Sequence, residues 1–245
     1  MIDIVTTATI RPDILDVTYN SFFKHLFKDS FEYRLIINID PVGDKRYTQG
    51  DVLRVAKKYF KNIVYNFPDQ SNFTKAVKWC WSKTESDYVF HLEDDWEILK
   101  DVDIYFLIGI LRFSKKIGSV RLLRCGLSSH RPFGVYGIED SNLVIDKKRN
   151  RCSLNPTLFR GDLVRNSSLV MVDDVNPEYQ LFPGFYKNIK AKDKKKINKC
   201  VSVFDHVAFR MSDVVCDIGR EWRKKNKISG GNNFLFWSDD ESTKI

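Results

Sequence analysis

The stretch DYVFHLEDDW, at residues 87–96, gives the clearest indication of the fold. Its first half is apolar and typical of a buried strand, and its end places Glu93, Asp94 and Asp95 side by side before Trp96. Like charges repel, so this cluster needs compensation. A divalent ion held by carboxylate oxygens would provide it. The alternative is a helix that begins at Trp96, with the acids at its positive end. Both interpretations stay open on this stretch alone.

The sequence before this stretch alternates between strand-like and helix-like segments. Strands are predicted at residues 2–8, 33–40, 62–67 and 87–92, and helices open at Pro12 and cover 52–60 and 72–83. This order indicates βαβ units. The sequence therefore predicts an α/β fold with a mainly parallel sheet flanked by helices.

Beyond residue 100 the alternation is weaker. The expected elements are, in order, a helix at 99–116, a strand at 119–125, irregular structure at 126–150, loop-to-helix transitions at 155–164 and 175–182, and a late strand and turn at 213–222. We see no internal repeat and no linker that would separate a second domain. We therefore predict a single domain with two halves, residues 1–100 and 101–245.

Polar side chains follow several of the predicted strands where each strand ends. Thr6, Thr7 and Arg11 come at the end of the first strand, and Asp40 ends the second. In parallel sheets, ligands bind beyond the carboxyl ends of the strands. We therefore expect these side chains to lie at one edge of the sheet, together with the acidic cluster at 93–95.

The cysteines and the apolar segments bear on the compartment. Five cysteines are an odd number with no close pair, which argues against a disulfide framework and a thiolate zinc site and fits a reducing compartment. No signal peptide is evident at the N-terminus. The most apolar stretch, residues 104–111, is far shorter than the roughly 20 residues of a membrane span. We expect a cytoplasmic protein without a membrane span, in the host cytoplasm if it is viral.

The net charge of +8 is concentrated in two segments of the C-terminal third. Residues 187–199 contain seven lysines and one aspartate, and residues 220–227 contain five basic residues and one acid. Clustered positive charge attracts polyanions, so both segments are candidates for such a contact. The competing interpretation is a solvated face. No helix-turn-helix, zinc-finger or RNA-recognition signature indicates sequence-specific binding.

Six short motifs together resemble one family of enzymes. TTATIRP at 6–12, INID at 37–40 and LEDDW at 92–96 resemble glycosyltransferases of the GT-A (Rossmann-like) fold, most closely those grouped as family 2. LNPTLFR, VNPEYQ and DIGREW, further along the chain, look like the acceptor-side half of such an enzyme. The resemblance implies a nucleotide-sugar-binding first half, residues 1–100, and an acceptor-side second half, residues 101–245.

The resemblance also implies roles for the acids. Thr6, Thr7 and Arg11 would line the nucleotide pocket, Asp40 would meet the uracil or ribose, and Glu93 and Asp94 would face the ribose and donor sugar. Asp95 would bind Mn²⁺ or Mg²⁺, as the last acid of the family's DxD motif. Related enzymes often supply a late histidine in a His-Ile-Gly-like turn; here Asp217 occupies that position as a candidate second ligand.

Catalysis and acceptor binding would involve mainly the second half of the chain, together with Trp96 of the first half. A carboxylate must take the proton of the acceptor hydroxyl in an inverting transfer. Glu178 is the first candidate and Asp174 the second; a helix cap or an exposed acid is the competing interpretation of each. The candidate acceptor-binding residues are Trp96, His130, Arg220, Trp222, Lys194, Lys195 and Lys196.

These observations predict a metal-dependent glycosyltransferase that uses a nucleotide-sugar, with a UDP-sugar favoured. Its acceptor would be a glycan or glycoconjugate, or a hydroxymethylated base in DNA, as in a DNA glycosyltransferase of viral type. The alternative is a catalytically inactive nucleic-acid-binding protein on a glycosyltransferase-like scaffold. A nucleotide-sugar and a glycan or DNA acceptor are thus the expected partners.

Overall fold

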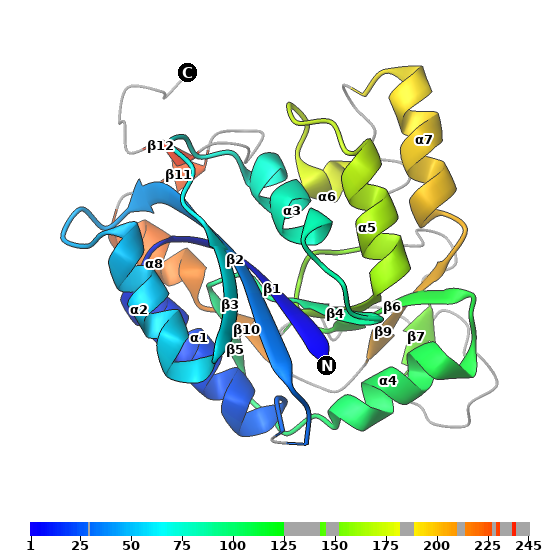
Figure 1. The fold of residues 1–245 in the computed structure, drawn as a ribbon, viewed down its shortest axis with the longest axis horizontal. Helices are drawn as coiled ribbons and strands as arrows, with labels where there is room; N and C mark the ends of the chain where they lie inside the picture. Colours follow the sequence, from blue (N-terminus) through cyan, green and yellow to red (C-terminus); the bar gives the residue numbers. More distant parts are fainter. Residues whose placement is uncertain are drawn as a thin grey trace.

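The protein is built around one mixed β-sheet (Figure 1). The computed structural model describes residues 1–28, 30–124, 143–145, 152–181, 189–209, 214–226, 229–230 and 237–238. Within these residues the sheet has eight strands in the order β3-β2-β1-β4-β8-β6-β9-β7. The strands are β1 (Ile2–Ile10), β2 (Tyr33–Gly43), β3 (Asn62–Asn66), β4 (Tyr88–His91), β6 (Ile117–Leu122), β7 (Leu143–Ile145), β8 (Thr157–Arg160) and β9 (Asp205–Phe209).

The first half of the chain forms the predicted βαβ units. Strands β3, β2, β1 and β4 are parallel neighbours, connected through α1 (Pro12–His25), α2 (Gln49–Tyr59) and α3 (Phe73–Ser82). Local sequence fixes the helix starts: Pro12 occupies the first turn of α1, and Asn72 caps α3. The expected strands and helices of this half are therefore confirmed.

The second half of the chain extends the same sheet. β8 lies antiparallel to both β4 and β6, β9 runs parallel to β6, and β7 pairs antiparallel with β9. The helices of this half are α4 (Ile104–Phe113), α5 (Gly161–Val170), α6 (Pro177–Gln180), α7 (Ala191–Val201) and α8 (Gly219–Lys225). The sheet is thus continuous across both halves, as expected for an α/β domain with a mainly parallel sheet.

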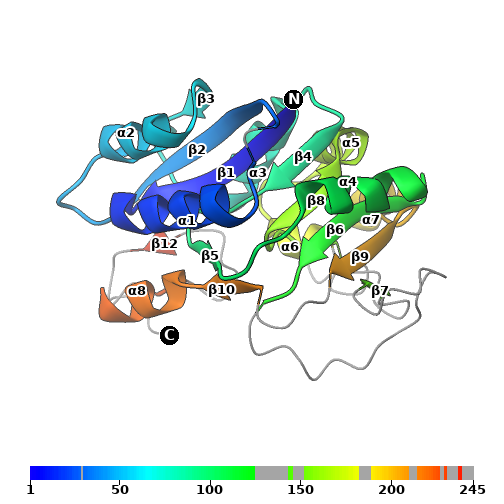
Figure 2. The ribbon, with the colours of Figure 1, turned by 90° about the horizontal axis from the view of Figure 1, so that it is seen from below.

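Helices cover both faces of the sheet and enclose two hydrophobic cores. α1, α2 and α4 pack on one face, while α3, α5 and α7 pack on the other (Figure 2). Phe22 and Leu107 are fully buried in the first core, and Trp81 and Phe159 in the second. This sandwich holds the strand ends rigidly, so the loops beyond those ends have a fixed frame.

The residues after the acidic cluster form a strand and not a helix. β5 (Trp96–Ile98) pairs antiparallel with β10 (Val215–Asp217), with Trp96 opposite Asp217. Trp96 and Ile98 are buried while Glu97 between them is partly exposed, which is strand periodicity. The interpretation of the acids as a cap for a helix beginning at Trp96 is therefore wrong. The pairing also brings the late segment 215–225 against residues 93–95, the acidic turn between β4 and β5.

Other differences concern boundaries. β2 continues past Asp40 to Gly43, which has a φ of 137° and lies so close to Ile10 that a Cβ would be 2.5 Å from the Ile10 carbonyl oxygen. The helix expected at 99–116 is the shorter α4, which Asp103 caps. The segment 155–164, expected as a loop entering a helix, contains strand β8 before α5.

Among the residues that the structure describes, no helix combines the length and apolar character needed to cross a membrane. Four cysteines fall within this part of the chain, and each carries a free thiol: Cys80, Cys152, Cys200 and Cys216.

Candidate functional site

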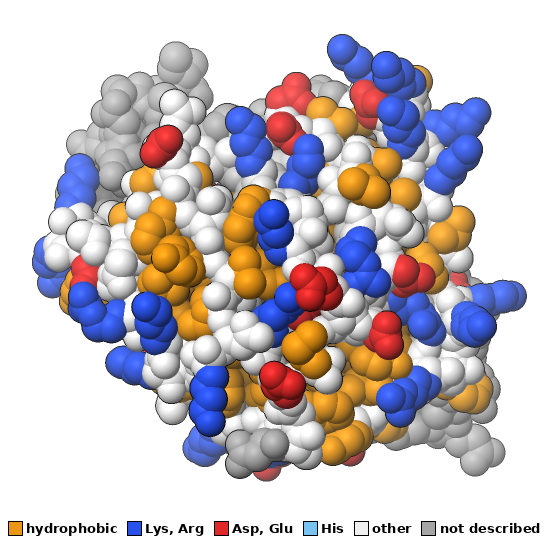
Figure 3. All heavy atoms as spheres, viewed as in Figure 1, with side chains coloured by type: hydrophobic (Ala, Val, Ile, Leu, Met, Phe, Trp, Pro, Cys, Tyr) orange, Lys and Arg blue, Asp and Glu red, His pale blue; other side chains and the backbone are white. Residues whose placement is uncertain are grey.

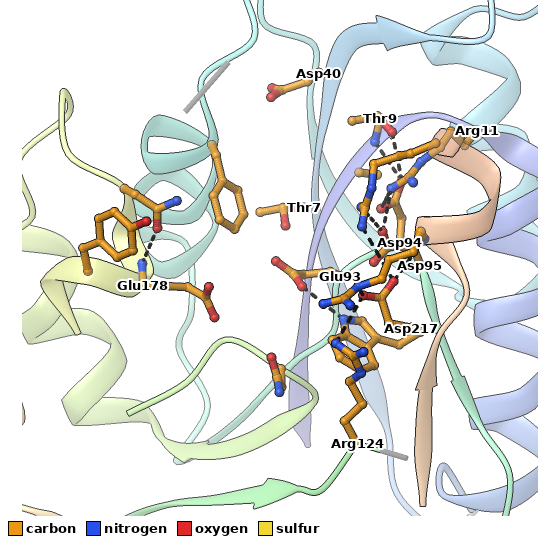
Figure 4. A pocket seen from close by; sticks show the side chains of 18 residues that line it. Thr7, Thr9, Arg11, Asp40, Glu93, Asp94, Asp95, Arg124, Glu178 and Asp217 are labelled. Carbon is orange, nitrogen blue, oxygen red and sulfur yellow. Dashed lines mark hydrogen bonds and ion pairs between the residues drawn. The ribbon is translucent and has the colours of Figure 1, made fainter. Parts of the chain in front are cut away.

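A pocket opens at the carboxyl ends of β1 and β4, as Figure 4 shows. Its volume of about 480 Å³ is in the range of small-molecule sites. One wall is formed by the acidic turn, β10 and α8, and the other by the loop that contains α6. The lining residues are Thr7, Ala8, Thr9, Arg11, Asp40, Phe73, Glu93, Asp94, Asp95, Trp96, Arg124, Asn155, Asn176, Glu178, Tyr179, Asp217, Arg220 and Arg223.

Asp94 is bound on several sides and fixes the acidic turn. Its Oδ2 accepts hydrogen bonds from the Thr9 backbone N–H at 2.9 Å and from Arg11 Nε at 3.3 Å, and Arg11 Nη2 pairs with its Oδ1. The Thr18 hydroxyl donates to the Asp94 backbone carbonyl at 2.8 Å. These contacts join the turn to β1 and α1, so Asp94 holds the turn in place.

Arg11 is a buried cation between the acidic turn and α8. Burial by itself would lower the pKa of Arg11, but the charges of Asp94 and Asp95 raise it above its ordinary value. The guanidinium carbon lies 5.2 Å from the ring centroid of Trp222, which is a cation–π contact. Arg11 therefore connects the first strand, the acidic turn and the late helix.

Asp95 and Asp217 face each other across the side chain of Arg223. Arg223 Nη1 lies 3.1 Å from Asp95 Oδ2, and Arg223 Nη2 lies 3.8 Å from Asp217 Oδ1. Arg220 Nε donates to Asp217 Oδ2 at 2.8 Å, and Arg124 Nη1 lies 3.8 Å from the same oxygen. Figure 4 shows Asp95, Asp217 and Arg124 on the same side of the pocket.

Gly219, the first residue of α8, allows this close approach. A Cβ at this position would lie 1.9 Å from Asp95 Oδ2. The Ile218 backbone N–H also donates to the Asp95 carbonyl at 3.0 Å. Any side chain at position 219 would push α8 away from the acidic turn, which gives the glycine of the DIGREW motif a clear structural role.

The arrangement around Asp95 and Asp217 does not fit a divalent ion. Guanidinium groups engage an oxygen of each carboxylate: Arg11 and Arg223 contact Asp95 Oδ2, and Arg220 contacts Asp217 Oδ2. Hard divalent ions require several oxygen ligands. Among the described residues, no group of three or more His, Cys, Asp or Glu side chains is arranged to hold a metal. The two candidate ligands are thus brought together, but with arginine between them.

Glu93 lines the pocket and faces Glu178 from the opposite wall (Figure 4). Burial, together with the charges of Asp95 and Glu178, raises the pKa of Glu93 well above its ordinary value. Trp96 Nε1 donates to Glu93 Oε2 at 3.0 Å and opposes this effect only in part. The two carboxyl groups thus stand on opposite walls, and burial disfavours the charged form of Glu93.

A network of hydrogen bonds holds the loop that carries Glu178. Asn176 caps α6 by accepting from the Glu178 backbone N–H at 2.8 Å. The buried Gln180 amide donates to the carbonyls of Val172 and Val175 at 2.8 and 2.6 Å. The Thr74 hydroxyl on α3 also donates to Val175, at 2.6 Å. The cap interpretation of this segment therefore applies to Asn176, and the Glu178 carboxylate extends to the pocket wall.

Asp40 forms the far end of the pocket, next to Asn38. The Asn38 amide donates to Asp40 Oδ1 at 2.8 Å, and the Asn66 amide on β3 donates to Asn38 Oδ1 at 2.7 Å. Burial raises the pKa of Asp40 to about 6, and the charge of Asp94 adds to this, against the hydrogen bonds from Asn38 and Asn72. Asp40 thus changes charge close to neutral pH.

The structure brings most of the sequence-predicted residues to this pocket. Those that line it are Thr7, Arg11, Asp40, Glu93, Asp94, Asp95, Trp96, Glu178, Asp217 and Arg220. Trp222 stands behind Arg11 and contacts its guanidinium. Their chemical roles remain predictions.

Other predicted residues lie elsewhere. Thr6 points to the opposite face of β1 because side chains alternate along a strand, and its hydroxyl accepts a hydrogen bond from the Tyr19 hydroxyl at 3.1 Å. Asp174 is exposed and is not among the residues that line the pocket. The lysines at 194–196 lie on α7, also outside the pocket lining. His130 falls outside the described residues.

Several lining residues were not predicted from the sequence. Thr9 follows Thr7 at the strand period of two, so alternation along TTATIRP could have identified it. Arg223 stands four residues after Gly219, which places both on one face of α8. Phe73, Arg124, Asn155 and Tyr179 come from separate segments, and no sequence signal joins them.

Comparison with solved structures identifies the fold. The truncated S. aureus TarS (residues 1–349) in complex with UDP-GlcNAc aligns with a TM-score of 0.51 and 13% identity, over 88% of this chain and 58% of that chain. The same protein in complex with UDP gives a TM-score of 0.55 and 12% identity, over 88% of this chain and 60% of that chain. No protein-family model and no curated protein sequence matches the chain.

A third structure supports the same assignment. The mannosyltransferase PcManGT from Pyrobaculum calidifontis, in complex with GDP-Man and Mn²⁺, aligns with a TM-score of 0.56 and 11% identity, over 92% of this chain and 59% of that chain. The chain spans less than two thirds of the length of these structures. The chain therefore has the GT-A fold of nucleotide-sugar glycosyltransferases, as the sequence motifs predicted.

Proposed function

We propose that the protein is a glycosyltransferase that moves a sugar from a nucleoside diphosphate sugar to an acceptor hydroxyl group. One observation carries this proposal: a pocket of about 480 Å³ at the carboxyl ends of β1 and β4 combines a wall of arginines with carboxylates in two different environments. The arginines suit a diphosphate, and the carboxylates suit proton transfer. The GT-A fold supports the assignment because fold neighbours are complexes with UDP-GlcNAc or GDP-Man.

The pocket suggests how the donor lies. The nucleoside occupies the end near Asp40 and Thr7, where an ionised Asp40 accepts a hydrogen bond from an N–H of the base or a hydroxyl of the ribose. The diphosphate lies against Arg220 and Arg223, and the sugar between Glu93 and Glu178. A uracil or a guanine base each offers a suitable N–H, so both UDP-sugars and GDP-sugars are candidate donors, with the UDP-sugar favoured by the sequence resemblance.

The reaction needs one base and one leaving group. In a single displacement, the acceptor oxygen forms a bond to the anomeric carbon as the bond from that carbon to the diphosphate oxygen breaks. The diphosphate leaves with the bonding electron pair, and Glu178 takes the proton of the acceptor hydroxyl. The raised pKa of Glu93 favours its protonated form, which donates a hydrogen bond to the sugar.

For the acceptor we propose only a class of molecule, one that carries a reactive hydroxyl group. A hydroxyl of a glycan or glycoconjugate satisfies the chemistry of Glu178, and so does a hydroxymethylated base. The DNA interpretation is based on two basic segments: the lysines at 194–196 do not line the pocket, whereas Arg220 and Arg223 of the second segment do. The competing proposal of an inactive nucleic-acid-binding protein relies on the same two segments and leaves the organised carboxylates of the pocket unexplained.

The test is donor turnover with matched acid variants. Purified protein is incubated with UDP-sugars and GDP-sugars, and release of UDP or GDP is followed with and without candidate glycan acceptors. We expect turnover with one donor class and a fall of about 100-fold or more in Glu178→Gln, consistent with loss of a general base. Asp174→Asn, an exposed acid in the same loop, is the control and keeps wild-type turnover.

Two results would contradict the proposal. Absence of release with every donor, together with absence of nucleotide binding, would remove the enzyme assignment. Loss of turnover in Asp174→Asn with full turnover in Glu178→Gln would leave the enzyme assignment but remove Glu178 as the base.

A further inference from the structure

The contacts of Arg223 place a cation between the two acids expected to bind a metal. Its two terminal nitrogens lie 3.1 Å from Asp95 Oδ2 and 3.8 Å from Asp217 Oδ1. Gly219, four residues earlier on the same face of α8, permits this by bringing the helix against the Asp95 carboxylate. The antiparallel pairing of β5 with β10 fixes the distance between the two acids. The position of Arg223 therefore follows from the fold.

The exposed charge on this wall is positive. The side chains of Asp95 and Asp217 are 10% and 11% exposed, whereas those of Arg124, Arg220 and Arg223 are 29%, 61% and 24% exposed. A ligand that enters the pocket thus meets guanidinium groups in front of the carboxylates. A divalent ion would need the opposite arrangement, with carboxylate oxygens directed into the cavity.

The exposure of the charged groups on this wall also suits an anion. Four guanidinium groups, on Arg11, Arg124, Arg220 and Arg223, contact the carboxylates of Asp94, Asp95 and Asp217, and Glu93 is the fourth carboxyl group of the wall. The two signs are equal in number, so the wall attracts an anion through the greater exposure of Arg124, Arg220 and Arg223. Arginine also presents paired N–H groups that match two oxygens of a phosphate.

We propose that Arg223, together with Arg124 and Arg220, takes the place of a divalent ion as the counter-charge for the donor diphosphate. This inference rests on the proposed function and changes its cofactor requirement: donor binding and turnover proceed without a metal. Asp95 and Asp217 become positioning residues that direct the guanidinium group toward the diphosphate. As the bond between sugar and diphosphate breaks, the leaving group keeps the electron pair, and the arginine N–H groups stabilise its added negative charge.

The proposal is tested by nucleotide binding with and without metal. Metal-free wild-type protein is titrated calorimetrically with UDP, GDP and the corresponding nucleosides, first in EDTA and then in Mn²⁺. We expect the nucleoside diphosphate to bind with affinities that agree within about threefold in the two conditions. Arg223→Gln should weaken diphosphate binding about tenfold or more, since a charge-assisted pair contributes about 1.4 kcal/mol or more, and leave nucleoside binding unchanged.

Lys225→Gln is the matched control because it removes one positive charge from the same helix, from an exposed residue that does not line the pocket. It should bind UDP and GDP as the wild type does. Arg223→Lys keeps the charge but loses the fork of two nitrogens, and should lie between the wild type and Arg223→Gln. Thermal unfolding of each variant shows whether α8 is still docked.

The outcomes separate this inference from the proposed function. Binding in Mn²⁺ that disappears in EDTA, with no further loss in Arg223→Gln, would overturn the arginine assignment and leave a metal-dependent glycosyltransferase. Absence of nucleotide binding in both conditions would overturn the proposed function, and the inference with it. The EDTA comparison uses the wild-type chain, so it gives an answer even if Arg223→Gln does not fold.

Discussion

Two basic helices of the same chain differ sharply in what their charges contact. α7 carries the lysines from Lys192 to Lys199 and buries only Ile197 and Val201, so most of its lysines are exposed on the surface of the molecule. Figure 3 shows basic side chains gathered at this corner, in the upper right of the view. α8 is shorter, and its Arg220 and Arg223 contact buried or partly buried acids at the pocket. The two helices lie apart in both views of the fold (Figures 1 and 2).

The difference shows that the role of a basic segment depends on which residues its side chains contact. Each exposed lysine of α7 contributes to the long-range field and is weakened by salt. The arginines of α8 face carboxylates, and Trp222 covers the buried Arg11. These contacts make α8 part of the pocket wall, whereas α7 is a solvated surface with two apolar anchors. The following predictions test this difference between the two helices.

The largest expected effect concerns Arg11, which connects α8 to the sheet. Arg11→Met leaves the buried acids Asp94 and Asp95 without their shared cation, and removing one partner of a buried ion pair costs about 3–5 kcal/mol. We expect a loss of this size in the free energy of unfolding, measured by urea denaturation. The control Arg54→Met removes an exposed arginine from α2. A loss in Arg11→Met no larger than in the control would contradict the role of Arg11.

The next effect concerns Asp40, a pocket acid beyond the reach of α8. Its folded-state pKa of about 6 lies above the ordinary value of 3.8, so the folded state binds the proton more tightly. The stabilisation is present below pH 4 and is lost as the pH rises through 6. The loss amounts to roughly 3 kcal/mol, at 1.36 kcal/mol for each pKa unit. Urea denaturation from pH 4 to 7 should show this decline in the wild type and a smaller one in Asp40→Asn. Equal pH dependence would refute the assignment.

A smaller effect is expected at Trp222, whose ring stacks on Arg11. Trp222→Ala removes the cation–π contact and part of the cover of the guanidinium, which should cost about 1–2 kcal/mol of unfolding free energy. Trp222→Phe keeps a ring at this position and should restore part of the loss. Chemical denaturation of the two variants measures the difference. Equal stability of Trp222→Ala and the wild type would mean that α8 docks without this contact.

The smallest effect on the pocket is expected from α7. Replacing Lys194, Lys195 and Lys196 with glutamine should leave nucleotide affinity unchanged and alter the unfolding free energy by no more than about 0.5 kcal/mol. If α7 forms a polyanion contact, the same variant should flatten the salt dependence of DNA or heparin binding, by up to about 0.9 in the logarithmic slope per lost DNA phosphate contact. A large fall in nucleotide affinity would contradict the separation of the two helices.

Much of the fold followed from the sequence because local patterns determine it. Alternating apolar strands and helices gave the order of the first half, and Pro12 and Asn72 mark helix starts through local chemistry. The strand β5 was missed because three residues are too short for a periodic signal, and its partner β10 lies more than a hundred residues away. Pairing between distant segments is a tertiary property that local patterns do not contain.

The sequence also predicted part of the candidate site, namely the residues that local strand patterns place at the sheet edge. The acids at the strand ends follow from the rule that parallel strands present their carboxyl ends at one edge. Thr6 was predicted beside Thr7, although alternation places them on opposite faces of β1. Arg124 was not predicted, because it meets Asp217 only through the folded chain, and Arg223 was expected only as part of the basic segment 220–227. The cationic wall is therefore a property of the assembled pocket.

Hydrogen exchange with and without a saturating nucleotide-sugar tests the central claim most directly. UDP-GlcNAc and GDP-mannose are the probes, and protection of backbone amides is followed along the chain by mass spectrometry. A ligand in the pocket should slow exchange at residues 6–11, 92–98 and 214–225, and leave α7 unchanged. Absence of protection with both donors, or protection confined to α7, would contradict the assignment of this pocket as the donor site.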